Sequence, residues 1–171
     1  MTASNHFDPD GNVHMVDVSA KSETVREALA SGEIRMAGET AAMIQAGTAK
    51  KGDVLGVARL AGIQATKLTQ QLIPLCHAIP VEAVSVDFTF MDTPAGSEAV
   101  LRCHTRVRTT AKTGVEMEAM TAVSIACLTV YDMIKSVDRG VVIGPIQLQE
   151  KSGGKSGDFR RSEANQVKGA D

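Results

Sequence analysis

Asp132 and Lys135 are the residues of this sequence whose types and spacing best suit acid–base chemistry. They lie three positions apart in the segment YDMIK (131–135), so on a helix they would share one face. The ordinary explanation for such spacing is a solvated ion pair, which contributes only about 0–1 kcal/mol. The preceding segment is almost entirely apolar, however, so we expect this helix end to be partly buried. There a carboxylate and an ammonium perturb each other and can serve as base and acid.

The segment KSGGKSGDF (151–159) raises the question of phosphate binding. Its centre reads GKS, like the end of a P-loop, but a P-loop needs a glycine five positions before Gly154, where this chain has Gln149. A polar tail also follows in place of the required helix. Two interpretations remain: a disordered tail, which the composition favours, or a lid in which Lys151, Lys155 and glycine amides surround a phosphate.

The segment LIPLCHAIP (72–80) places Cys76 and His77 between two prolines, at a junction between a helix and a strand. Such junction loops often carry binding sites. The histidine could activate a thiolate, although adjacent side chains rarely point at each other. A zinc site would need further ligands, and the chain has no CxxC or HxxxH spacing. An ordinary buried cysteine beside a hydrogen-bonded histidine explains the pair equally well.

Two further groups of charged residues lie near expected helix ends. In KTGVEMEA (112–119), Glu116 and Glu118 suit the positive end of a helix dipole, or could bind the N–H donors of a guanine-like ring. Lys50 and Lys51 precede a glycine-containing helix and Lys67 lies within it. These lysines either solubilise the surface or line a site for a polyanion.

The patterns that must position these residues predict an α+β sandwich, with helices packed on one face of an antiparallel sheet. Helical spacing predicts helices over 22–31, about 39–47, 53–73 and 116–137, with Asp53 as an N-cap and Gly32 and Pro74 as terminators. Alternation predicts a hairpin at 84–90 and 101–108, in which Cys103 faces the core and His104 faces out, and a last strand follows at 140–150. We expect one domain over 1–171, with an irregular arm at 1–20 and a flexible Gly/Lys-rich tail at 151–171.

Composition restricts the function classes. The net charge is −2, the pI is about 6.1 and aromatic residues make up 3% of the chain, so we expect no nucleic-acid partner and no membrane surface. We see no apolar run of about 18 residues and no signal peptide at the N-terminus. Three cysteines without framework spacing indicate free thiols and a cytoplasmic location.

Seven motifs occur in an order that is far more specific than any one of them: HMVDVSAKSETVREA, KGDV, ARLAGIQATK, LIPLCH, KTGVEMEA, LTVYDMIK and KSGGKSGDF. Over about residues 12–159 the chain closely resembles the cyclic pyranopterin monophosphate synthases, the molybdenum cofactor biosynthesis protein C family. The resemblance implies a ferredoxin-like fold and a homohexamer built as a trimer of dimers. It also implies a lyase that converts 3′,8-cyclo-7,8-dihydroguanosine 5′-triphosphate to cyclic pyranopterin monophosphate and releases pyrophosphate.

The resemblance also implies roles for individual residues. The motifs place catalytic residues at Asp132, Lys135 and Lys51. The expected contacts to the nucleotide-derived substrate are Lys67, Leu75, Cys76, His77, Glu116, Met117, Glu118, Lys151 and Lys155. No cofactor is certain and no dedicated metal ligands are visible, although a divalent ion such as Mg²⁺ could accompany the triphosphate. The glycine-rich tail then becomes a lid that orders over the substrate phosphates.

Two other classes use the same residues differently. A nucleotide-binding regulatory oligomer would need the lysines but no acid–base pair, so replacing Asp132 would spare its function. A zinc-dependent hydrolase or deaminase would use Cys76, His77 and a distant ligand, and would contain metal when purified. Without the resemblance, the sequence predicts only an α+β protein that binds a phosphate-containing ligand.

Overall fold

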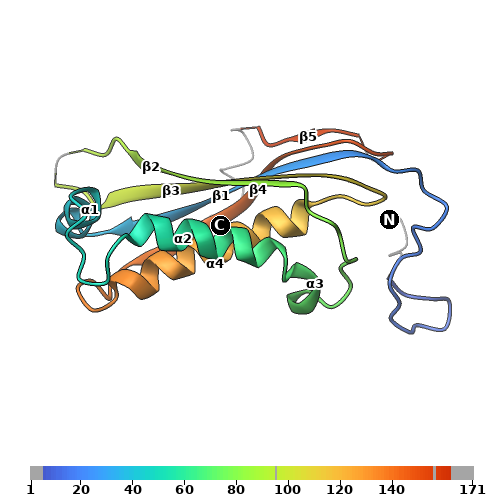
Figure 1. The fold of residues 1–171 in the computed structure, drawn as a ribbon, viewed down its shortest axis with the longest axis horizontal. Helices are drawn as coiled ribbons and strands as arrows, with labels where there is room; N and C mark the ends of the chain where they lie inside the picture. The colour runs from blue at the N-terminus through green and yellow to red at the C-terminus, as the bar shows by residue number, and fades with distance from the viewer. Residues whose placement is uncertain (1–5, 95, 156, 163–171) are drawn as a thin grey trace, which may run out of the picture.

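The protein is a two-layer α+β structure, here a computed structural model that describes residues 6–94, 96–155 and 157–162. Five antiparallel strands form one sheet in the order β2-β3-β1-β4-β5 (Figure 1). Up to β4, the chain order β-α-β-β-α-β and the strand order are those of the ferredoxin-like fold, which confirms the predicted fold class. The elements are β1 (Thr24–Met36), α1 (Gly38–Gln45), α2 (Val54–Thr66), α3 (Thr69–Leu72), β2 (Ala83–Met91), β3 (Ala99–Ala111), α4 (Glu116–Ile134), β4 (Val142–Ser152) and β5 (Phe159–Arg160).

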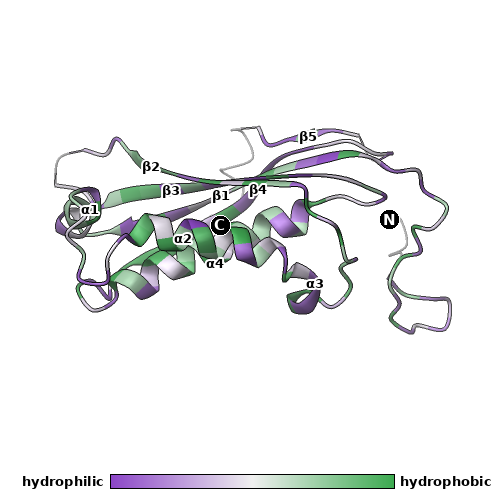
Figure 2. Ribbon diagram, in the orientation of Figure 1, coloured by the Kyte–Doolittle hydropathy of each residue, from purple (hydrophilic) through white to green (hydrophobic). Residues whose placement is uncertain are grey.

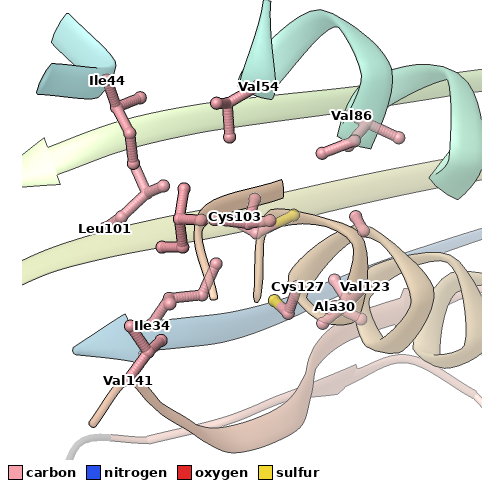
Figure 3. Packing of buried hydrophobic residues seen from close by; sticks show 14 of the residues in the cluster. Ala30, Ile34, Ile44, Val54, Val86, Leu101, Cys103, Val123, Cys127 and Val141 are labelled. Atoms are coloured by element: carbon pink, nitrogen blue, oxygen red, sulfur yellow. The ribbon is translucent and has the colours of Figure 1, made fainter. Parts of the chain in front are cut away.

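Helices α2 and α4 pack side by side on one face of the sheet and enclose the core between the two layers (Figure 1). The core is built from small and branched aliphatic side chains of β1, β3 and α4, with the thiols of Cys103 and Cys127 among them (Figure 3). In α4, hydrophobic residues occupy the middle and hydrophilic residues lie toward both ends (Figure 2). The helix is therefore fixed to the sheet along its middle, while its two ends present polar groups.

The predicted hairpin is confirmed as β2 and β3, with Val86 opposite Thr105 and Phe88 opposite Cys103. Cys103 is fully buried, whereas His104 lies on the face of the sheet without helices and is half-buried. The alternation was a reliable guide because one face of this sheet is covered and the other is not.

The helix predicted over 22–31 is wrong, because this segment belongs to the long central strand β1. Alternate residues of β1 are buried against the helices, including Ala28, Ala30 and Ile34. Gly32 does not end a helix but lies where α4 approaches the strand closely. A Cβ there would come within 2.7 Å of Val123 Cγ1. The tertiary contacts of the central strand thus override its local helix propensity.

The other helix predictions are confirmed with changed limits. Asp53 caps α2 by accepting a hydrogen bond from the Gly56 amide at 2.8 Å, but a break at 67–68 separates α2 from α3. Helix α4 ends at Ile134 rather than near 137. By length and hydropathy α4 would suffice to span a membrane, contrary to the sequence expectation. Of its most apolar 18-residue window, however, 56% is buried inside the protein, as is usual for a core helix.

The glycine-rich segment partly continues the sheet. Strand β4 runs to Ser152, and the short strand β5 returns beside it, with Lys151 opposite Phe159. At residues 151–152 and 159–160 the chain is therefore paired strand, not tail. The predicted tail beyond residue 162 lies outside the described residues.

Candidate active site at the two ends of helix α4

Asp132 lies between two lysines near the C-terminal end of α4. Its carboxylate is 2.8 Å from Lys135 Nζ and 3.1 Å from Lys51 Nζ. The same Lys51 ammonium donates a hydrogen bond to the Asp132 carbonyl oxygen at 2.6 Å. Lys51 precedes α2, so this cluster, which we call the Asp132 cluster, joins the start of α2 to the end of α4.

The structure does not support the expectation that this helix end is partly buried. The side chain of Asp132 is 56% exposed and that of Lys135 is 51% exposed. The buried face of α4 ends with Val130 and Ile134, and Asp132 points away from that face. Within one chain, the Asp132 cluster is therefore open to solvent.

The lysines nevertheless determine the protonation of this cluster. Hydrogen bonds from Lys135 and then Lys51 lower the pKa of Asp132 below its ordinary value, and the carboxylate in turn raises the pKa of Lys135. Asp132 is thus an anion and Lys135 a cation throughout the neutral range. In these charge states Asp132 can accept and Lys135 can donate a proton, and the ion pair makes each transfer less favourable than it is for the isolated groups.

The opposite end of α4 carries two carboxylates in different environments. Glu116 forms an ion pair with Lys151 on β4, with 3.0 Å between Lys151 Nζ and Glu116 Oε1. Glu118 is only 3% exposed, and burial raises its pKa, with Glu116 as a smaller cause. Both residues lie in the first turn of α4, where the helix dipole favours negative charge.

A cavity of about 1250 Å³ lies beside Glu116 and is rich in cationic side chains. We call it the basic cavity. The sequence predicted Lys155 there, but not Lys21, Arg26 or Lys112, which also line it. One feature of the sequence could have indicated Arg26: it shares the alternating register of the buried positions of β1, where a charged side chain is unusual. The erroneous helix over 22–31 concealed that register.

The Cys76–His77 segment lies at the same end of the molecule, and the structure does not couple the two side chains to each other. The His77 ring donates through Nε2 to the carbonyl of Val16 at 2.8 Å and so anchors the N-terminal arm. Burial raises the pKa of Cys76, with the charge of Glu118 as a second cause. Its thiol is therefore not activated as a nucleophile. Leu75 beside it is half-buried.

Lys67 and Met117 complete the predicted set and are both exposed. Lys67 caps the C-terminal end of α2. Because α2 runs antiparallel to α4, with Gly62 against Ala122 and Ala126, Lys67 lies toward the Glu116 end of α4.

The structure therefore divides the predicted site into two groups. The nine expected substrate contacts lie toward the Glu116 end, and the three expected catalytic residues lie at the Asp132 end. Asp132 follows Glu116 by sixteen positions in α4, which at 1.5 Å per residue is about 24 Å. The two ends are clearly apart in Figure 1.

The described part of the chain lacks the group of ligands that a metal-binding site requires. No group of three or more His, Cys, Asp or Glu side chains is placed there to hold a metal ion. Cys103 is buried in the core, whereas Cys76 is half-buried. The residues considered for zinc thus do not converge.

The fold and the two clusters define an α+β protein with a cationic cavity and a separate carboxylate–lysine pair. Residues 15–154 match the MoaC family. The chain is also 60% identical to the cyclic pyranopterin monophosphate synthase of Rhodopirellula baltica over 163 residues, covering 92% of this chain and 93% of that protein. This chain belongs to the MoaC family.

Proposed function

We propose that this protein is a lyase of molybdenum cofactor biosynthesis that converts 3′,8-cyclo-7,8-dihydroguanosine 5′-triphosphate to cyclic pyranopterin monophosphate and pyrophosphate. The observation that carries the proposal is the 60% identity, over nearly the whole chain, to a relative named for making this product. The basic cavity and the Asp132 cluster supply the two kinds of group that such a reaction requires: cations for a triphosphate and a paired base and acid.

The cyclic phosphate forms when a substrate hydroxyl attacks the α-phosphorus. A new O–P bond forms, the bond from the α-phosphorus to the bridging oxygen breaks, and pyrophosphate leaves. Asp132 accepts a proton in this scheme, and Lys135 and Lys51 balance negative charge that develops in the transition state. The two lysines keep Asp132 ionised at neutral pH, which is the state that a base requires, and the same lysines weaken its basicity.

The remaining residues bind the substrate in this proposal. Lys155, with the missed Lys21 and Lys112, lines the basic cavity and contacts the phosphates there, and Lys151 reaches them from its ion pair with Glu116 at the edge of that cavity. Lys67, Leu75, Cys76, His77, Glu116, Met117 and Glu118 surround the guanine-derived ring system. A divalent ion such as Mg²⁺ is compatible with this proposal as a companion of the phosphates, since it commonly binds through them and one or two carboxylates.

The proposed assembly is a homohexamer, a trimer of dimers, in which each site combines the basic cavity of one chain with the Asp132 cluster of another. The separation of about 24 Å along α4 supports shared sites, because one chain would otherwise hold its base far from its substrate. Apolar side chains on the outer side of the helical layer support burial by a partner: Leu60 is 68% exposed and Leu128 is 54% exposed. The proposed location is the cytoplasm, with no nucleic-acid or membrane partner.

Turnover of the cyclic dihydroguanosine triphosphate tests the activity. Wild type should release pyrophosphate and cyclic phosphate product together, and Asp132→Asn should bind substrate but turn over about 10²–10⁴-fold more slowly, the range for loss of a general base. The matched control is Asp138→Asn, since Asp138 caps α1 through the Ala37 amide and Thr40. Binding without pyrophosphate release by wild type would instead support a regulatory nucleotide-binding protein.

Subunit mixing tests the shared site separately. Asp132→Asn chains, which have a low kcat, and Lys151→Ala chains, which have a high KM, are dissociated, mixed in equal amounts and reassembled. Turnover is then measured at substrate concentrations well below the KM, where both single variants are impaired. If each site takes one cluster from each chain, about a quarter of the sites in the mixture contain two intact clusters, as expected for a symmetric dimer. Recovery to near that fraction supports the shared site, and no recovery in reassembled oligomers would place both clusters of a site in one chain.

A further inference from the structure

Arg26 is a buried cation without a carboxylate partner among the described ion pairs. It is 8% exposed and lies on the helix-covered face of β1. Its guanidinium donates to three backbone carbonyls: Nε to Ala111 at 3.3 Å, Nη2 to Lys112 at 3.4 Å and Nη1 to Gly153 at 3.2 Å. The side chain thus joins the end of β3 to the turn that follows β4.

The turn contains two adjacent glycines, and residues with a side chain would not fit at these positions. Gly153 and Gly154 have φ of +91° and +79°, a region that other residues rarely adopt. A Cβ on Gly154 would collide with the Arg26 guanidinium, and one on Gly153 would collide with the Val25 carbonyl. The glycine pair is therefore explained by packing onto β1 and Arg26, without any P-loop.

This contact fixes the chain where β4 leaves the sheet. Lys151 is still paired with Ala28 of β1 and reaches Glu116, whereas Lys155 lies beyond the glycines and lines the basic cavity. The two lysines can face one ligand only if the intervening turn keeps its course. Arg26 holds that turn, and Lys112, whose carbonyl it also binds, lies on the same cavity wall.

We infer that Arg26 is a positioning residue: its planar guanidinium holds the Gly153–Gly154 turn against β3 and so fixes Lys155 and Lys112 around a phosphate-containing ligand. The ligand class rests on the proposed function, whereas the contact does not. The planar shape of the guanidinium is essential to this role. A lysine would preserve the charge but could not bind three carbonyls on two segments.

The first test is hydrogen exchange in the free protein, followed in peptides that cover 150–155. Arg26→Lys should exchange about tenfold to a hundredfold faster there than wild type, which is the scale for losing hydrogen bonds from a charged donor. Peptides from the middle of α4 should be unchanged. The matched control is Arg35→Gln, on the other face of the same strand, where Arg35 pairs with Glu33. Unchanged exchange at 150–155 in Arg26→Lys would overturn the inference.

The second test separates positioning from charge by titrating inorganic pyrophosphate into each variant in a calorimeter. Positioning requires that Arg26→Lys and Arg26→Gln bind it similarly and about tenfold more weakly than wild type. If Arg26→Lys binds like wild type and only Arg26→Gln is weak, Arg26 acts through its charge and the inference fails.

A double-mutant cycle tests the contact itself. Gly154→Ala should destabilise wild type more than it destabilises Arg26→Ala, because the collision requires the guanidinium, while the strain of positive φ remains in both. Equal effects would exclude direct packing. These measurements need no turnover, so a protein that passes them but does not convert the cyclised nucleotide would retain the Arg26 contact and lose the proposed activity.

Discussion

The two ends of α4 differ in enclosure, in charge and in what they can do alone. At the Glu116 end, a buried carboxylate, an ion pair and a basic cavity all lie within one chain. At the Asp132 end, a carboxylate between two lysines is more than half exposed. Catalysis generally requires a site that excludes water. In the proposed hexamer, the Asp132 end would be covered by the Glu116 end of another chain.

The pKa values of one carboxyl group at each end of α4 are shifted in opposite directions. Burial raises the pKa of Glu118, whereas two ammonium groups lower the pKa of Asp132. Carboxyl groups whose environments push their pKa values in opposite directions are suited to opposite roles in proton transfer. The environment of Asp132 favours the carboxylate, whereas the environment of Glu118 favours the neutral carboxyl, which can donate a hydrogen bond.

The largest expected effects come from the lysines of the Asp132 cluster. Lys135→Gln and Lys51→Gln should each lower kcat by about 10²–10³-fold, the scale for removing one charge-stabilising group from a transition state. The KM should change less, since in the proposed scheme these lysines balance charge that develops only in the transition state. Steady-state kinetics against the matched control Lys50→Gln, which replaces the exposed neighbouring lysine, checks this. A pure KM effect would assign the lysines to binding and remove the contrast between the ends.

Gly32→Ala should act on the helix that carries both ends. The added Cβ would meet Val123 Cγ1 at 2.7 Å and Cys127 Sγ at 3.0 Å, so α4 must shift away from β1. Overpacking of this kind lowers the free energy of unfolding by about 1–3 kcal/mol. Gly38→Ala is the control, because a Cβ there meets nothing within 4 Å. Urea denaturation of both variants measures the difference, and an unchanged Gly32→Ala would mean that α4 is not held by this contact.

Gly32 also shows where prediction from the sequence succeeds and fails. The hairpin and α4 follow from local periodicity, since each has one covered face. Strand β1 does not, because its buried positions include Ala28, Ala30, Gly32 and Arg26, which carry little β propensity. A central strand is specified by its neighbours on both sides, and these are distant in sequence.

The residues of the candidate site also fall into those that local sequence patterns predict and those that they do not. The Asp132–Lys135 pair is readable from its spacing, and the sequence placed both residues on one helical face. The partnership of Asp132 with Lys51 and of Glu116 with Lys151 joins segments 81 and 35 residues apart, by subtraction of their numbers. No local pattern encodes such pairs. Lys21 and Lys112 were missed for that reason, since the basic cavity exists only once β1, β3 and β4 are assembled.

Breaking the ion pair at the Glu116 end should have a smaller effect on activity, and this effect should be on the KM rather than on kcat. Lys151→Ala should raise KM by about tenfold with kcat nearly unchanged, the scale for one charge-assisted contact to a phosphate. Glu116→Gln, which removes the carboxylate charge from this ion pair but keeps the shape of the side chain, should raise KM less. Initial-rate kinetics over a range of substrate concentrations separates the two constants. An equal loss of kcat in Lys151→Ala would show that the Glu116 end also takes part in the chemical step.

The smallest expected effect is a pH dependence of stability with opposite sign at the two ends. Asp132 has a folded pKa below its ordinary 3.8, so its contribution is present above that pH and is lost as the pH falls through the folded pKa. Glu118 has a folded pKa above its ordinary 4.5, so its contribution is present below that pH and is lost as the pH rises through the folded pKa.

The variants should therefore diverge from wild type in opposite directions. With rising pH from about 4 upward, Glu118→Gln should gain stability relative to wild type, because it lacks a carboxyl that must ionise while buried. Asp132→Asn should lose stability relative to wild type as the pH rises through the folded pKa of Asp132, because only wild type gains the ion pairs. Urea midpoints measured below pH 3.8 follow the Asp132 trend, and midpoints measured above pH 4.5 follow the Glu118 trend. Parallel trends would mean that the buried and exposed carboxylates titrate alike, and that enclosure does not distinguish the two ends of α4.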